Sequence, residues 1–215
     1  MKRFFAIIAI AAIFTLLFVF AARRDRKTET IVYREHLSET VATLEGEALT
    51  LKDLAFYVGY QEQKVDFQAQ LYDPKHPKNW WNTHTNGEFL RVTARTDAVD
   101  MLLHDTYFFR RAEEAGLSLT PEETALAESA AYDFWTDLSD KGKEALGITA
   151  EDVETTCERI ALAQKAQLSL CGETGLDYEA YDVGGKGWED IKAGLKITTE
   201  DTLLSRLAFG TITIN

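Results

Sequence analysis

Residues 112–123 have the sequence AEEAGLSLTPEE, and this stretch decides how the middle of the chain folds. Ala112 belongs to an apolar stripe of helical spacing, and Gly116 is the residue type that most often follows the end of a helix. The following Thr120-Pro121-Glu122-Glu123 combines a capping hydroxyl, a first-turn proline and an acid at the third position. We therefore expect one long helix to end at about Ala115 and the next to begin at Pro121.

Helical spacing of apolar residues continues on both sides of this junction. The predicted helices run from about Leu51 to Tyr72, from a capping box at Thr85–Glu88 to about Ala115, from Pro121 to about Leu138, and from Ala150 to about Cys171. Thr50 with Asp53, and Thr149 with Asp152, are predicted to cap the first and last of these helices.

Extended structure is predicted on either side of the helical region. The stretch VATLEGEALT at 41–50 alternates around Glu45-Gly46 and favours a short hairpin or an extended arm. A short helix from about Thr199 to Leu207 is predicted to lead into a terminal strand, FGTITIN, at 209–215. The predicted fold class is therefore mainly α, with long helices and a small β element.

The N-terminal region has a different composition from the rest of the chain. Residues 4–22, FFAIIAIAAIFTLLFVFAA, are apolar except for one Thr, and a helix of that length spans about 28 Å, close to the hydrocarbon core of a bilayer. We expect residues 1–27 to form an N-terminal transmembrane helix, as a membrane anchor or uncleaved signal. A cleaved secretory signal stays open, because Val19-Phe20-Ala21 resembles a weak cleavage site. Residues 28–40 are predicted to be a charged spacer, and residues 41–215 one helical domain.

Acidic residues dominate the chain beyond the apolar run. The protein has 215 residues, with 23 Lys and Arg against 35 Asp and Glu. Its first 27 residues hold six of the basic and one of the acidic residues, so residues 28–215 carry a net charge of −17. A domain of this charge is repelled by nucleic acid, so no nucleic-acid partner is expected.

Sequence patterns of catalytic or metal-binding sites are weak. The four histidines, His36, His76, His84 and His104, form neither HExxH nor an i, i+4 pair. Gly184-Gly185-Lys186-Gly187 differs in spacing from phosphate-binding loops, and Asp177, Glu179 and Asp182 fit only half of a calcium loop. We therefore expect no catalytic residues, no metal and no cofactor, and binding rather than catalysis.

Two segments resemble a known family. VATLEGEALTLKDLAFYV resembles the opening of SurA/PrsA-type extracytoplasmic folding factors. The later order of Ala112, Gly116, Leu117, Leu119, Thr120, Glu122 and Glu123 is similar to the helix junction of the same modules. The resemblance covers about residues 41–171. It departs from the family at Glu45, where Asn is usual, and in the 44 residues after Cys171, which show no parvulin-type isomerase domain.

The resemblance implies a SurA N-terminal or trigger-factor-like peptide-binding module that contacts unfolded or secreted polypeptides and lies outside the cytoplasm. It would be held in the cell membrane as a single-pass protein through residues 4–22, or secreted if the signal is cleaved. Counting cations alone favours the opposite orientation. Two alternatives stay open: a module that binds one dedicated partner of a membrane complex, and a prolyl isomerase on a different scaffold.

Aromatic residues outside the main helical stripes are the predicted peptide-binding site. Rings supply rigid, apolar contacts with little directional demand, as a binder of nonnative chains needs. The predicted contacts are Trp80, Trp81, Tyr57, Tyr60 and Phe108. Since adjacent residues of an extended chain point to opposite sides, we expect one of the two tryptophans to be buried and the other partly exposed.

Overall fold

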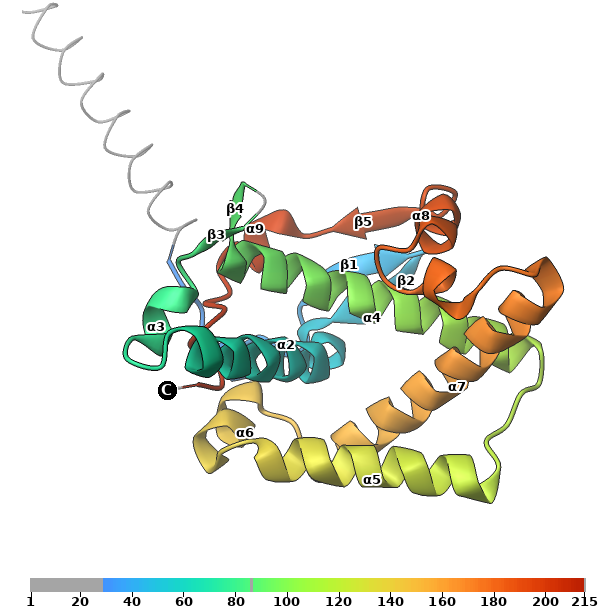
Figure 1. The fold of residues 1–215 in the computed structure, drawn as a ribbon, viewed down its shortest axis with the longest axis horizontal. Helices are drawn as coiled ribbons and strands as arrows, with labels where there is room; N and C mark the ends of the chain where they lie inside the picture. The colour runs from blue at the N-terminus through green and yellow to red at the C-terminus, as the bar shows by residue number, and fades with distance from the viewer. Residues whose placement is uncertain (1–28, 86, 215) are drawn as a thin grey trace, which may run out of the picture.

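The computed structural model describes residues 29–85 and 87–214. It confirms a mainly helical fold with a small sheet (Figure 1). The elements in chain order are η1 (Tyr33–Glu35), β1 (Thr40–Leu44), β2 (Glu47–Thr50), α2 (Leu51–Tyr72), α3 (Pro77–Trp80), β3 (His84–Thr85), β4 (Glu88–Phe89), α4 (Leu90–Glu114), α5 (Pro121–Asp137), α6 (Asp140–Leu146), α7 (Ala150–Thr174), η2 (Tyr178–Tyr181), α8 (Lys186–Lys192), β5 (Ile197–Thr199) and α9 (Asp201–Leu204).

Local capping chemistry sets three of the helix starts as predicted. Thr50, Thr120 and Thr149 each accept a hydrogen bond from the backbone N–H three residues later. In each case the acidic side chain at that third position accepts from the N–H of the cap, which completes a capping box. The helices α2, α5 and α7 therefore begin at the expected residues.

The capping box predicted at Thr85–Glu88 is wrong. Thr85 pairs with Glu88 in the short β3–β4 hairpin, and α4 begins two residues later at Leu90. The N–H of Leu90 donates to the carbonyl of Thr83, so the turn before the helix satisfies a donor that a cap would otherwise bind.

Two layers meet in the body of the molecule. The antiparallel sheet, in the order β2-β1-β5, packs against α2 and α4. Helix α7 crosses from the end of α5 to α4 and packs most extensively on α4, while α5 lies along the opposite side of α7 (Figure 1). The pair α5–α7 therefore extends away from the sheet as an arm of two helices.

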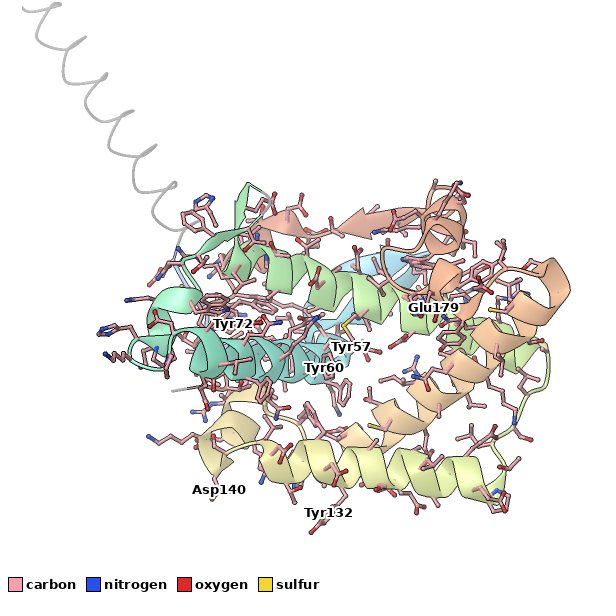
Figure 2. All side chains as sticks on the ribbon, viewed as in Figure 1. Tyr57, Tyr60, Tyr72, Tyr132, Asp140 and Glu179 are labelled. Atoms are coloured by element: carbon pink, nitrogen blue, oxygen red, sulfur yellow. The ribbon has the colours of Figure 1, made fainter. Side chains whose placement is uncertain are left out.

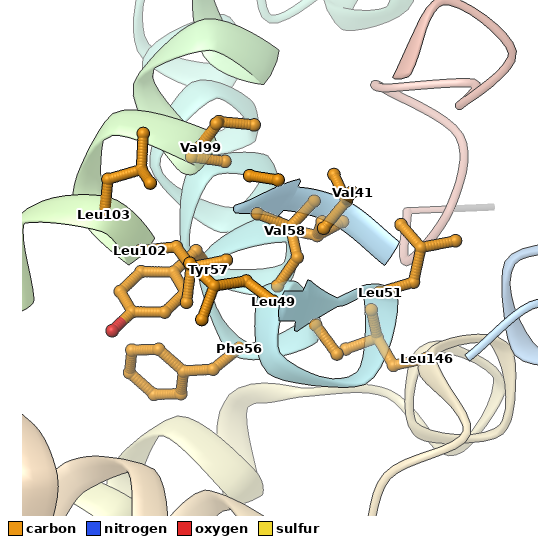
Figure 3. Packing of buried hydrophobic residues seen from close by; sticks show 14 of the residues in the cluster. Val41, Leu49, Leu51, Phe56, Tyr57, Val58, Val99, Leu102, Leu103 and Leu146 are labelled. Carbon is orange, nitrogen blue, oxygen red and sulfur yellow. The ribbon is translucent and has the colours of Figure 1, made fainter. Parts of the chain in front are cut away.

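The core lies where the sheet meets α2 and α4. Figure 3 shows Val41 and Leu49 from the hairpin packed beside Val58 of α2 and Leu103 of α4. All four side chains are buried. Apolar burial of this kind, at about 25 cal/mol per Å², is the main stabilising contribution to such a fold.

The C-terminal strand predicted at 209–215 is wrong. The strand that completes the sheet is β5, and the short helix that follows it ends earlier than expected, at Leu204. The segment after Phe209 is irregular because its backbone N–H groups bind a side chain instead of a strand. Gly210, Ile212 and Thr213 all donate to the carboxylate of Glu62, which is fully buried on α2.

The region predicted to be a spacer is part of the folded body from Ile31 onward. Tyr33 is buried in the core cluster, and its hydroxyl donates to the carbonyl of Leu51. The Ile31 N–H donates to the Arg206 carbonyl at 3.1 Å. The buried Tyr33 ring and the Ile31–Arg206 backbone hydrogen bond therefore hold this segment in the fold, although its many charged residues had predicted a solvent-exposed spacer.

The predicted membrane anchor at residues 4–22 lies outside the described residues. Within residues 29–85 and 87–214, no helix combines the length and the apolar character that crossing a bilayer requires.

Candidate peptide-binding groove

The structure does not bring the five predicted site residues together. Phe108 is 0% exposed and Tyr57 only 4%, and both lie in the core. Trp81 is also buried, Trp80 is half-buried, and Tyr60 is 42% exposed on α2. A polypeptide lying on this surface would therefore meet Tyr60 and the edge of Trp80, while the other three rings contribute through packing.

Of the two adjacent tryptophans, one is buried and the other is half-buried, as expected. Trp81 packs against Gly210, where an added Cβ would lie 2.5 Å from the indole. Trp80 stacks on Tyr72, with ring centroids 5.5 Å apart and an angle of 16° between the planes. The buried indole thus joins the C-terminal segment to the α2–α3 turn, and its neighbour covers the end of α2.

An apolar groove lies between α5 and α7, away from those tryptophans. Leu126 of α5 is 71% exposed and Leu168 of α7 is 62% exposed, and both line the same hollow of about 420 Å³. The other lining residues are Phe56, Glu123, Ala127, Ala130, Cys157, Ile160, Ala161, Gln164, Lys165 and Tyr178. The groove is therefore bounded by large apolar side chains on two helices.

Helix periodicity explains the shape of this groove. The lining positions on each helix recur at steps of three and four residues, so they form one stripe per helix. Small side chains, Ala127, Ala130 and Ala161, stand between the larger ones and leave a depression. The stripes extend about 10 Å along α5 and about 16 Å along α7, enough for roughly four extended residues.

Aromatic rings close the inner end of the groove. Phe56 of α2 packs on Phe134 of α5 with ring centroids 4.4 Å apart, and Tyr60 lies parallel to Phe56 at 6.4 Å. Tyr178 from η2 also lines the groove, and burial raises its pKa to about 12, so its hydroxyl stays neutral. Of the predicted residues, Tyr57 and Tyr60 both pack on Phe56, with ring centroids 5.5 Å and 6.4 Å away, so they reach the groove through that ring.

Acidic side chains surround the apolar stripes. Helix α5 carries five acidic residues and no Lys or Arg, and α7 carries five acidic and two basic residues. At the rim, Lys165 donates to Glu123 at 2.6 Å and to the Ser118 carbonyl at 3.0 Å. The Lys165 hydrogen bond holds the pKa of the Glu123 carboxyl below its usual value. The groove is therefore apolar inside and negative around its edges.

Sequence reasoning missed the groove because the apolar spacing of α7 was used only to predict a helix. Ile160 and Ala161 are partly buried and Leu168 is 62% exposed, and Leu126 was not selected at all. The sequence did contain a signal, because α7 has apolar residues around more of its circumference than one neighbouring helix can cover. Helix α4 packs on one face of α7, and α5 covers only part of the adjacent face.

A buried polar network lies behind Tyr57 and Phe108. The Tyr57 hydroxyl donates to Asp105 at 3.0 Å, and Asp105 also lies 2.8 Å from Nδ1 of His104. Nε2 of His104 lies 2.8 Å from the Tyr181 carbonyl, so both ring nitrogens have partners. Burial and the Asp105 carboxylate raise the pKa of Tyr57 well above its ordinary value. The network fixes η2 against α4.

The glycine- and acid-rich segment after α7 is also packed. Gly185 and Gly187 lie so close to Ala180 and Tyr181 that a Cβ on either would meet an atom at 2.5–2.8 Å. Asp182 accepts a hydrogen bond from Gln167 at 2.8 Å. Within the described part of the chain, no group of three or more His, Cys, Asp or Glu side chains converges as a metal site would require.

Comparisons with known protein families, with curated proteins and with solved structures each found no match. The groove is therefore interpreted from its own shape, exposure and charge.

Proposed function

We propose that this protein binds nonnative, extended polypeptide segments in the α5–α7 groove, as a chaperone-like module that is held in a membrane and faces the extracytoplasmic side. The observation that carries the proposal is the pair Leu126 and Leu168, which are exposed on facing helices and line one apolar hollow. The resemblance to SurA/PrsA-type folding factors supports the same function and the location, and the apolar run at 4–22 supports the membrane attachment.

The chemistry of the groove favours a particular class of client. An apolar floor binds side chains without demanding a fixed hydrogen-bond pattern, so sequence selectivity would be low. The excess of acidic residues on α5 and α7 attracts basic or neutral segments and repels acidic ones. The preferred client is therefore an unfolded stretch that alternates apolar residues with Lys or Arg.

A dedicated folded partner is the second candidate. The observation that favours it is the network of Tyr57, Asp105 and His104, which fixes η2, the element that supplies Tyr178 to the groove, against α4. A preformed surface suits a single partner, because little rearrangement is needed for binding. The two candidates differ in client range, since a chaperone protects several unrelated proteins and a dedicated subunit protects none.

Suppression of client aggregation tests the proposal. We expect the double variant Leu126→Ser and Leu168→Ser to weaken protection of several unrelated unfolded proteins by about tenfold or more, since each exposed leucine contributes about 1–2 kcal/mol of apolar contact. The matched control is Tyr132→Ser, because Tyr132 is 69% exposed on the same helix α5 but points away from the rest of the molecule (Figure 2).

The outcomes separate the alternatives. Equal protection by the parent and by the double variant would contradict the groove as client site. Binding of one folded protein without any protection of unfolded ones would favour the dedicated partner. Acceleration of cis–trans exchange in an Xaa-Pro peptide would establish an isomerase instead, and we expect none, since the sequence shows no parvulin-type domain.

A further inference from the structure

The end of the molecule formed by α2, α3 and the β3–β4 hairpin has a surface that the α5–α7 groove does not use. Phe67, Leu71 and Tyr72, on the last turns of α2, are exposed by 71%, 62% and 67%. They line a hollow of about 1140 Å³ beside the α5–α6 junction and Ile214. Such a run of large exposed apolar side chains on one helix end indicates a contact surface.

Unpaired cations accompany these apolar side chains. Lys64, Lys75, Lys78 and Arg91 are all exposed, and none of them forms an ion pair with any described residue. Residues 64–91 carry four Lys or Arg against three Asp or Glu, while residues 28–215 as a whole carry a net charge of −17. Positive charge is therefore concentrated at this end of an acidic domain.

Aromatic rings with polar edges complete the surface. Trp80 is half-buried and stacks on Tyr72. The Arg91 guanidinium lies 5.1 Å from the centre of the Phe89 ring, and Phe89 is itself exposed. Trp and Tyr gather at membrane interfaces, where one side of the ring is apolar and the other is wet, and Lys and Arg extend their charged ends toward phosphates.

The start of the described chain places this surface near the predicted anchor. The Glu29 carbonyl accepts from Nε of Arg206 at 3.0 Å, and Gly210, four residues after Arg206, contacts Trp81. Figure 1 shows the described chain entering at the same end of the molecule as α3 and the hairpin. Glu29 follows Ala22 by seven positions, so the end of the apolar run is at most about 24 Å from Glu29.

We propose that this surface, defined by Phe67, Leu71, Tyr72, Lys75, Lys78 and Trp80 and called the tip, docks on the surface of an anionic bilayer. Acyl chains and glycerol backbones would meet the three α2 side chains, and lipid phosphates would meet the two lysines. The proposal rests on the membrane attachment proposed above but not on client binding.

Docking of the tip would fix the orientation of the groove. The tip is at the α3 end of the molecule, whereas Leu126 and Leu168 lie on the α5–α7 arm toward the opposite end (Figure 1). A docked molecule would therefore present the groove away from the membrane, where emerging polypeptide can reach it.

Protection of lysines in vesicles tests the proposal. The full chain is reconstituted in vesicles of phosphatidylcholine with 30 mol% phosphatidylglycerol, or kept in neutral detergent, and a membrane-impermeant acylating reagent modifies exposed amines. We expect Lys75 and Lys78 to react at least about threefold more slowly in vesicles, while the exposed Lys196, next to β5, reacts equally in both. High salt should remove most of the protection, because the Debye length falls to about 3 Å at 1 M.

A charge reversal with a matched control provides the second measurement. Tryptophan emission is quenched by lipids brominated near the headgroup, and the tip contains the half-buried indole of Trp80. The variant Lys75→Glu with Lys78→Glu should reduce the docking equilibrium constant about 30-fold or more, because each lysine near an anionic surface contributes about 1 kcal/mol. The quenching should fall accordingly. The control Lys186→Glu with Lys196→Glu makes the same charge change on exposed lysines of α8 and the segment before β5, and should leave the quenching unchanged.

Several results would overturn the proposal. Equal amine reactivity of Lys75 in vesicles and detergent would show that the tip does not touch lipid. Equal quenching in the parent and the tip variant, or failure of the full chain to associate with vesicles, would have the same meaning. Cross-linking of the tip to a second copy would assign the surface to self-association instead. The tip variant should keep full aggregation suppression in detergent, so loss of docking and loss of client binding are separable.

Discussion

The carboxylate of Glu62 should determine how firmly the C-terminal segment is held. Its Oε1 accepts from the N–H groups of Gly210 at 2.6 Å and Ile212 at 3.1 Å. Its Oε2 accepts from the N–H and the hydroxyl of Thr213, both at 2.6 Å. Four donors thus converge on one buried side chain. The perturbation we consider is Glu62→Gln.

The magnitude follows from the number of donors. Gln keeps one carbonyl oxygen but puts an NH₂ group where Oε2 accepts two bonds, so the Thr213 N–H faces another donor. An unsatisfied buried donor costs about 1–3 kcal/mol, and the remaining bonds lose their charge assistance. In the parent protein, the cost of burying a charged carboxylate partly offsets the stabilisation from its hydrogen bonds. Burial disfavours the charged form and raises the pKa of Glu62, while the four hydrogen bonds lower that pKa. We therefore expect a net loss of about 2 kcal/mol.

Urea and thermal unfolding of the purified protein measure this loss. For a domain of this size, a loss of about 2 kcal/mol corresponds to a fall in Tm of about 4–8 °C. The control Glu128→Gln, on the exposed face of α5, should change stability by less than about 0.5 kcal/mol. Amide exchange of residues 210–213 should accelerate in the Glu62 variant before exchange in β1 does. Unchanged stability together with unchanged exchange at 210–213 would refute the reasoning.

Three further predictions concern single positions. Gly210→Ala should cost about 3 kcal/mol in urea unfolding, because φ is +93° and a Cβ would lie 2.5 Å from the Trp81 ring; a loss under 1 kcal/mol would contradict this. Thr149→Ala should cost about 1 kcal/mol by removing the cap of α7, and unchanged unfolding would show that the box contributes nothing. Burial raises the pKa of the Cys157 thiol to about 11, so its alkylation rate should rise about tenfold per pH unit from pH 8 to 10; a plateau near pH 9 would contradict the burial.

Most of the fold follows from local signals in the sequence. The threonine–acid pairs at Thr50, Thr120 and Thr149 predict the helix starts, because each box satisfies donors within four residues of chain. The hairpin around Glu45-Gly46 was equally local, since both residues have positive φ. Features that depend on residues far away in the sequence were not predictable from local patterns. The prediction of a terminal strand at 209–215 was wrong for that reason.

The C-terminal segment illustrates the limit. FGTITIN alternates like a strand, yet Glu62, about 150 residues earlier, accepts its backbone N–H groups. No periodicity within 209–215 contains that information. The same holds for Thr85 and Glu88, whose spacing suits a capping box but whose backbones pair across a two-residue turn. Local patterns therefore predict which structure a segment can adopt, and tertiary hydrogen bonds decide which one it does.

The candidate site was harder to predict than the fold because apolar residues are ambiguous. An aromatic residue outside the main apolar stripe of a helix can lie in the core or on the surface. Phe67 and Phe108 both occupy such positions, so the sequence does not distinguish them. Phe108 is enclosed by His104 and Trp188, whereas Phe67 has no comparable cover and is 71% exposed. Only the path of the chain after α7, which brings Trp188 back onto α4, separates the two cases.

Charge explains how such apolar surface remains compatible with a soluble domain. Exposed patches of this kind normally favour self-association, and like charges around them oppose it. The acidic α5–α7 arm fits this requirement, because two molecules meeting groove to groove would bring their carboxylates together. The tip combines exposed apolar side chains with the exposed Lys75 and Lys78, and Asp66 and Asp137 line the hollow beside it. In the proposed arrangement an anionic bilayer would cover these apolar side chains, within the reach of the chain between Ala22 and Glu29.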